Sequence, residues 1–203
     1  MFKILKGVYA ERADPAFLTC PQGYAAGFLS ETQIRQFALN PENEMSETFV
    51  EEALSRGDQC FAICVGAALA AYGWYSFRPT PIGLSDLYLG FGPSWVYMYK
   101  GYTHPRYRGE RLHAIGMSMA LQHYVSNGFR GLVSYVESTN FDSLRSVFRM
   151  GYQCFGSVYI ARLLGRFAAT CSPGCEKFQF RVAPKRLAAP CAPVMSQATS
   201  RPA

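Results

Sequence analysis

A basic segment in the middle of the chain has the residue types and the position to bind a phosphate group. It runs from His104 to His113 (HPRYRGERLH) and includes Arg106, Arg108 and Arg111. A helix that begins directly after a strand leaves its first backbone N–H groups unpaired, and these groups attract anions. Arginine adds charge and a planar fork of donors that matches phosphate. The segment therefore indicates a pyrophosphate-binding turn; an ordinary basic loop over a helix end is the alternative.

Two elements must position this turn. Residues 94–103 (SWVYMYKGYT) have the aromatic and β-branched content of a central strand, and Pro105 ends it because proline has no N–H for the ladder. Residues 110–126 repeat apolar side chains at helical spacing, and Asn127-Gly128 is typical of a helix C-cap. The pattern thus predicts a strand, the basic turn and a helix in direct succession.

The other elements predict a mixed α/β domain. Further strands are expected over residues 23–29, 60–65, 69–77, 131–136 and 152–164, and further helices after Ser30, over residues 46–55, and from Asn140 or Asp142 to Arg149. The first twenty residues read as a loop or a short strand, and residues 79–93 as a loop or an edge segment. The resulting order is antiparallel strands first and a β-α-β-α-β unit later.

Length and composition fit one folded domain followed by a tail. The chain has 203 residues, of which 49% are hydrophobic and 17% charged, enough to bury a core. We place the domain at residues 1–166 and a basic Pro/Ala-rich extension, expected to be partly disordered, at residues 167–203. Residues 151–203 carry seven basic side chains and one acidic, which equals the whole net charge of +6. This indicates an anionic partner or a solvated basic tail.

Two segments resemble the signatures of the GNAT acyltransferase superfamily. The turn that starts with His104–Gly109 looks like the pattern V-x-P-x-Y-R-G-x-G-x-G/H, whose loop binds pyrophosphate in that superfamily. Asn140–Tyr152 (NFDSLRSVFRMGY) is similar to the second signature, N-x-x-A/S-x-x-x-Y-x-x-x-G-F. The resemblance covers roughly residues 23–166. It implies a central mixed, mostly antiparallel sheet of six to seven strands flanked by about four helices.

The sequence departs from each signature at a position that matters. In the first, Arg111 stands in place of a glycine and would either crowd a phosphate or reach around it, while His113 stands in place of a small residue. In the second, Val147 stands where many members carry the tyrosine that protonates the leaving thiolate, and neighbouring Phe148 has no hydroxyl. An enzyme with these residues needs another proton donor or water.

The resemblance implies transfer of an acyl group, most often acetyl, from acyl-CoA to a primary amine by direct attack. Acetyl-CoA or another acyl-CoA is therefore the expected co-substrate. The backbone at Tyr102 and Thr103 would hold the pantetheine and the thioester carbonyl. The remaining cofactor-binding residues that the two signatures imply are Arg108, Gly109, Glu110, Arg111, Leu112, His113, Asn140 and Ser143.

Two side chains are candidates for acid–base chemistry. Glu137 ends the strand that would splay from residues 94–103, so its carboxylate is our candidate base; a charge that stabilises a helix N-terminus is the alternative. Tyr99 alternates with Tyr97 and Tyr102 on one strand face, where it would line the acceptor pocket or donate a proton, or simply pack in the core.

The remaining features bear on other classes of protein. Seven cysteines fit reduced thiols, and Cys171 and Cys175 lack a second pair at metal spacing, so no metal is expected. The uncharged stretch 59–77 reads as two strands and no secretory signal is evident, so we expect a cytoplasmic protein without a membrane span. Nucleic-acid binding ranks low, because the tail has no recognised motif.

Two alternatives to an acetyltransferase stay open: a non-catalytic CoA-binding sensor or scaffold, and an enzyme that uses a longer acyl chain. Whether the protein forms a homodimer and which amine accepts the acyl group also stay open.

Overall fold

The computed structural model describes residues 2–83 and 87–184. The helices are α1 (Glu31–Ala38), α2 (Glu47–Arg56), α3 (Leu112–Ser126) and α4 (Phe141–Arg149), with four 3-10 turns, η1 (Pro15–Phe17), η2 (Pro41–Asn43), η3 (Pro105–Tyr107) and η4 (Pro173–Phe178). The strands are β1 (Phe2–Ala10), β2 (Tyr24–Phe28), β3 (Gln59–Val65), β4 (Ala68–Ser76), β5 (Thr80–Pro81), β6 (Leu87–Gly90), β7 (Trp95–Thr103), β8 (Gly131–Glu137), β9 (Gln153–Leu163), β10 (Arg166–Cys171) and β11 (Arg181–Pro184).

Eight of these strands form one sheet in the order β10-β9-β1-β8-β7-β4-β3-β2. All neighbouring strands in it are antiparallel except β7 and β8, which are parallel. A second, three-stranded sheet has the order β11-β6-β5. The predicted mixed, mostly antiparallel α/β fold is confirmed; the main sheet has eight strands, where six to seven were expected.

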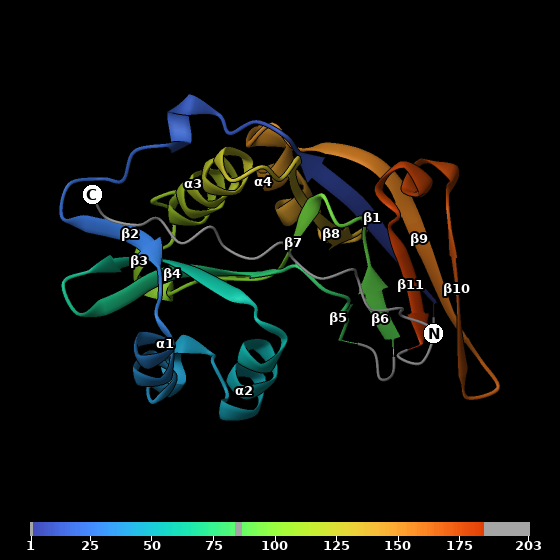
Figure 1. The fold of residues 1–203 in the computed structure, drawn as a ribbon, viewed down its shortest axis with the longest axis horizontal. Coiled ribbons are helices and arrows are strands. Elements are labelled where there is room, and N and C mark those ends of the chain that lie inside the picture. Colours follow the sequence, from blue (N-terminus) through green and yellow to red (C-terminus); the bar gives the residue numbers. More distant parts are fainter. Residues whose placement is uncertain (1, 84–86, 185–203) are drawn as a thin grey trace, which may run out of the picture.

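The main sheet is covered on both faces (Figure 1). Helices α3 and α4 lie on one face, and α1 and α2 lie on the opposite face over β2, β3 and β4. Next to α1 and α2, the small sheet packs on β7, β8, β1 and β9, where Leu89 and Phe178 meet Tyr97 in one buried cluster. Under α1 and α2, Ile34 packs with Trp74 in another. On the opposite face, Leu121 of α3 packs with Val147 of α4 in a third cluster, so each face of the sheet has its own apolar layer.

Local sequence signals account for the helices near the site. Ser30 caps α1 with a complete capping box, in which Gln33 bonds back to the cap residue. Helix α2 ends at Gly57, whose φ of 77° places it in the left-handed conformation that glycine adopts without a side-chain clash. That turn directs the chain from α2 straight into β3, so Asp58 lies beside the last turn of α2.

The first twenty residues were expected to form a loop or a short strand, and the structure has a strand there that is longer than expected and central in the sheet. Residues 2–10 form a full strand, β1, which lies between β8 and β9 and pairs with both. A strand inside a sheet that is covered on both faces has buried side chains on both sides, so its sequence does not alternate cleanly. Its two lysines also break the apolar pattern: Lys3 forms an ion pair with Glu137, and Lys6 bonds to Ser157.

The chain continues in regular structure past the expected boundary at residue 166. Strand β10 pairs with β9, β11 pairs with β6, and η4 contributes Cys175 and Phe178 to the buried cluster under the small sheet. Residues 185–203, which include Cys191 and the rest of the expected basic extension, lie outside the described residues. Within residues 2–83 and 87–184, no helix combines the length and the hydropathy needed to cross a membrane.

Candidate functional site

The two parallel strands of the main sheet part after a very short contact. Strand β7 pairs with β8 only through Trp95, Val96 and Tyr97. Just beyond, the Ser134 hydroxyl donates to the carbonyl of Met98 at 2.8 Å, and the ladder between these strands does not continue. The remaining part of β7, up to Thr103, pairs with β4 alone among the strands of the described residues. A V-shaped opening between β7 and β8 therefore begins at Met98.

Strand β7 bulges at the point where this opening begins. Lys100 pairs with Trp74 and Met98 pairs with Tyr75, so Tyr99 is an extra residue without a partner on β4. A bulge of this kind leaves backbone groups unpaired and bends the strand. It also keeps Tyr99 on the face of Tyr97, whose ring centroid is 5.9 Å away. Backbone hydrogen-bonding groups are thus presented next to the vertex of the opening.

The basic turn follows β7 as predicted, with η3 between the strand and α3. Gly109 has a φ of 89°, and Arg111, the residue before α3, has a φ of 61°. Arg111 therefore adopts the left-handed conformation that glycine favours, at the position where the first signature has a glycine. No side chain caps α3 among the described residues, so its first N–H groups are available to an anion.

The turn is held from both sides. The Tyr24 hydroxyl donates to Glu110 at 2.6 Å, and this hydrogen bond raises the pKa of Tyr24 to about 12. The Arg108 guanidinium donates to the carbonyl of Thr103 at 3.3 Å. Leu112 is buried and anchors the start of α3 in the core. The side chains of Arg106, Arg108 and Arg111 are left exposed around the turn.

His113 packs against the backbone of β7. A Cβ atom on Gly101 would lie 2.3 Å from Cε1 of His113, so only a glycine at this position leaves room for the ring. Burial lowers the pKa of His113, which favours the neutral imidazole. The contact fixes the first turn of α3 relative to the second half of β7, which lines the opening.

The second signature forms the start of α4. Asn140 accepts a hydrogen bond from the backbone N–H of Ser143 at 3.1 Å and so acts as the helix cap. Val147 is buried in the core under α3, while neighbouring Phe148 is exposed. The position that holds a tyrosine in the signature thus points into the apolar core in this chain.

Glu137 is at the far end of β8, on the same face of the sheet as Tyr97 and Tyr135. Its carboxylate is 2.6 Å from Nζ of Lys3, and both side chains are partly exposed. It lies four residues beyond Val133, the last residue of β8 that pairs with β7. At about 3.3 Å per residue, this places Glu137 about 13 Å along the strand from the last pair.

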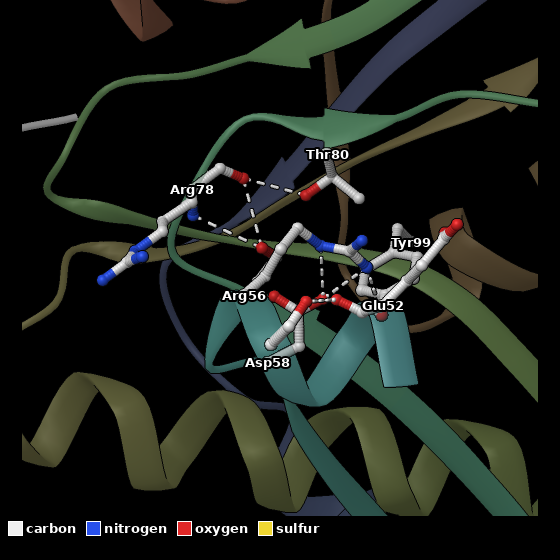
Figure 2. Close-up of polar contacts among 8 residues, drawn as sticks. Glu52, Arg56, Asp58, Arg78, Thr80 and Tyr99 are labelled. Carbon is white, nitrogen blue, oxygen red and sulfur yellow. Dashed lines mark hydrogen bonds and ion pairs between the residues drawn. The ribbon is translucent and has the colours of Figure 1, made fainter. Parts of the chain in front are cut away.

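Tyr99 makes a contact that the sequence did not suggest. Its hydroxyl donates to Oδ2 of Asp58 at 2.9 Å, and Arg56 donates to the same oxygen through Nε and Nη2 at 3.0 and 2.7 Å. Figure 2 shows the three side chains converging from α2, the start of β3 and the bulge of β7. Burial raises the pKa of Asp58, and its three side-chain neighbours, including Ser76, only partly offset this effect.

Asp58 was absent from the predicted site because it lies in the short connection between the helix expected over residues 46–55 and the strand expected over residues 60–65, away from both signatures. A usable signal was present, since an acidic residue directly before an apolar strand is placed at the edge of the core. The structure brings Asp58 together with the predicted Tyr99. It does not bring Glu137 into this cluster, because Glu137 pairs with Lys3.

A polar cleft of about 450 Å³ adjoins the first half of the turn. It is lined from the turn by His104, Arg106 and Tyr107, and from η2 by Glu42 and Asn43. Its size is within the range of small-molecule sites. Among the described residues, no group of three or more histidine, cysteine, aspartate or glutamate side chains is arranged to hold a metal ion.

Comparisons with known proteins support the fold through structure alone. No family model matches the sequence, and no curated protein matches it. A GNAT-family protein from Novosphingobium aromaticivorans superimposes with a TM-score of 0.54 at 16% identity, over 78% of this chain and 63% of that chain. A GCN5-related N-acetyltransferase-like protein from Streptococcus suis gives 0.54 at 10% identity, over 78% and 61%. A tandem GNAT protein from the clavulanic acid biosynthesis pathway gives 0.52 at 15% identity, over 75% and 50%.

This chain thus spans between half and just under two thirds of the length of these solved structures. At identities this low, the likeness concerns the arrangement of the backbone. The chain has the fold of the GNAT superfamily of N-acetyltransferases.

Proposed function

We propose that the protein is an N-acyltransferase that moves an acyl group, most simply acetyl, from acyl-CoA to a primary amine. The observation that carries this proposal is the opening between β7 and β8, with a strand bulge at its vertex and an uncapped helix N-terminus at its mouth. The strand bulge offers hydrogen-bond donors to a thioester carbonyl, and the helix N-terminus offers donors to a pyrophosphate.

The cofactor would lie along the second half of β7. The diphosphate would meet the N–H groups at the start of α3, with Arg108 and Arg111 beside it. The pantetheine would pair with backbone groups of β7 near Tyr102 and Thr103, which lack a second strand partner among the described residues. The thioester would then reach the bulge at Tyr99, where unpaired backbone groups would polarise its carbonyl.

The amine would approach from the face of the sheet that carries Tyr99, Tyr135 and Glu137. Glu137 is one candidate base on this face: its side chain is 45% exposed, but it could accept a proton only after its pair with Lys3 has opened. Val147 supplies no hydroxyl to the leaving thiolate, so that proton would come from elsewhere.

Binding of the co-substrate is tested by the shift in melting temperature with acetyl-CoA, CoA and a long-chain acyl-CoA. A ligand at about 100 times its Kd stabilises the folded state by about 2.7 kcal/mol, which is about 5–11 °C for a chain of this size. Arg108→Ala combined with Gly109→Pro should abolish the shift. Arg12→Ala, a change of an exposed arginine outside the turn, should leave it intact.

Turnover is tested by release of free CoA thiol in the presence of a panel of primary amines, including a polyamine, an arylalkylamine and peptides with a free N-terminus or a lysine. Transfer to any of them, lost in the turn variant, supports the enzyme. No stabilisation by any CoA compound would refute both cofactor binding and transfer.

The buried Val147 favours a second candidate, a protein that binds acyl-CoA without turning it over. This alternative predicts the same thermal shifts but no thiol release with any amine. The two assays on one preparation therefore separate an enzyme from a CoA-binding sensor or scaffold.

A further inference from the structure

Arg56, Asp58 and Tyr99 form a largely buried polar cluster that joins the end of α2 to the bulge of β7. The carboxylate of Asp58 is fully buried, while Arg56 is 17% exposed. Oδ2 accepts three hydrogen bonds, yet Oδ1 accepts none from the described residues. A buried carboxylate with one unsatisfied oxygen is costly. Such groups are retained where they carry out proton chemistry.

The cluster is also closer to the vertex of the opening than the other carboxylate on this face. Tyr99 lies two residues beyond Tyr97, the last residue of β7 that pairs with β8. This is about 7 Å along the strand, against about 13 Å for Glu137. Both carboxylates are in ion pairs, Asp58 with Arg56 and Glu137 with Lys3, but only Asp58 also accepts a hydrogen bond from a tyrosine of β7. A proton leaving an amine at the vertex therefore meets the Tyr99 phenol before it meets Glu137.

We propose that Asp58, acting through Tyr99, takes up the proton that the substrate ammonium must lose before it attacks the thioester. This inference rests on the proposed acyltransferase function and assigns the proton acceptor within it. Asp58 is a positioning and proton-storing residue behind Tyr99, and Tyr99 is the group that contacts the substrate.

The proton transfers balance without any further reactant. The ammonium gives one proton to the phenol oxygen of Tyr99 while the phenol proton moves to Oδ2 of Asp58, leaving a neutral amine. The amine then forms the C–N bond as the C–S bond breaks, and its second proton passes to the sulfur, which leaves as CoA thiol. Asp58 returns its proton to solvent before the next cycle. The Arg56 guanidinium holds the carboxylate in place throughout.

Few other titratable or charged groups face Asp58. From α2 it meets Arg56, from β7 Tyr99, and from α3 the Tyr124 phenol, whose pKa burial raises and the Asp58 charge raises further. Arg78 bonds through its backbone to the nearby Ser76, and its side chain points away from Asp58 (Figure 2). Since burial raises the pKa of Asp58, the relay predicts that kcat increases with pH above the ordinary aspartate range, as Asp58 ionises.

The test measures kcat from roughly pH 5 to 9, with acetyl-CoA and the amine that the wild-type enzyme acetylates fastest. Asp58→Asn and Tyr99→Phe should each lower kcat by about 10²–10⁴-fold, with little change in KM for the amine. Each should also remove the acidic limb of the profile. The double variant should be no slower than either single one, because both changes interrupt the same path.

Glu52→Gln is the matched control, since it removes a carboxylate from the same helix at an exposed position. It should leave kcat and the pH profile unchanged. Stabilisation of each variant by acetyl-CoA shows that the variant is folded. If Asp58→Asn does not fold, the relay is tested with Tyr99→Phe alone, which keeps the aromatic ring and removes only the hydroxyl.

Two results would overturn the relay. One is a Tyr99→Phe enzyme with kcat within about threefold of wild type and an unchanged acidic limb. The other is loss of that limb in Glu137→Gln while Asp58→Asn retains it. Absence of transfer by the wild-type protein with every amine would instead overturn the proposed function, before any variant is compared.

Discussion

Gly131 is the residue at which three strands of the main sheet come together, and replacing it by alanine should open that junction. It starts β8, pairs with Trp95 of β7, and lies against the end of β1. A Cβ atom at this position would lie 2.1 Å from the carbonyl oxygen of Ala10. The obstacle is a backbone atom inside a ladder, so no side-chain rotation relieves the contact.

The expected cost follows from that geometry. Contacts of this type are not found below 3.0 Å, so β1 and β8 must separate by roughly 1 Å. Overpacking of a well-packed core costs about 1–3 kcal/mol, and the rigid obstacle places Gly131→Ala near the upper end. About 3 kcal/mol corresponds to a fall in melting temperature of about 6–12 °C for a chain of this length.

Urea and thermal unfolding measure this effect. Gly27→Ala is the matched control, because Gly27 is also a strand glycine but has no atom within 4 Å of the position that the added methyl group would occupy. The control should be within about 0.5 kcal/mol of wild type. If Gly131→Ala is as stable as Gly27→Ala, the close approach of the end of β1 to the start of β8 is wrong.

Three other measurements test separate parts of the structure. Ser30→Ala removes the capping box of α1 and should lower the free energy of unfolding by about 1 kcal/mol in urea titrations; an unchanged midpoint would contradict the cap. Arg111→Gly relieves a left-handed backbone and should leave stability unchanged or raise it by up to about 1 kcal/mol, whereas a clear loss would show that the Arg111 side chain is needed for folding. Burial raises the pKa of Asp58 in the folded state, so the folded protein holds this proton more strongly than the unfolded chain does. Wild type should therefore lose stability relative to Asp58→Asn as the pH rises above about 4, and the opposite trend in urea unfolding would refute the shift.

The sequence predicted those elements whose signals are local. Ser30 and Ser46 cap their helices as their residue types indicate, and the β3–β4 hairpin turns at Gly66, as the break in the apolar run suggested. The length and central position of β1 escaped prediction because the strand is buried on both faces and its partners lie far along the chain. The ordered segment after residue 166 escaped for a related reason: its apolar residues Cys175 and Phe178 are separated by polar ones and find their partners in β6 and β9.

The site residues show the same difference between local and distant sequence signals. The turn from Arg108 to His113 was located correctly as a strand-to-helix connection, because its charge, glycine and flanking periodicity are contiguous. Its binding of a cofactor stays a prediction. Asp58 was missed because its importance depends on a contact with Tyr99, 41 residues away, which no local pattern reveals. The left-handed backbone of Arg111 explains how this chain departs from the glycine of the first signature while keeping the shape of the turn.

The central position of β1 has a consequence for synthesis of the protein. Strand β1 leaves the ribosome before both of the strands with which it pairs, and 134 residues separate Lys3 from its partner Glu137. At about 5–20 residues per second, β1 waits roughly 7–27 s for β8 to emerge, with both edges unsatisfied. Such distant pairing is slow, because a long loop must close before its contacts form. The nascent chain therefore carries an aggregation-prone segment until β8 and β9 have emerged, and a chaperone that shields residues 2–10 should increase the yield of folded protein.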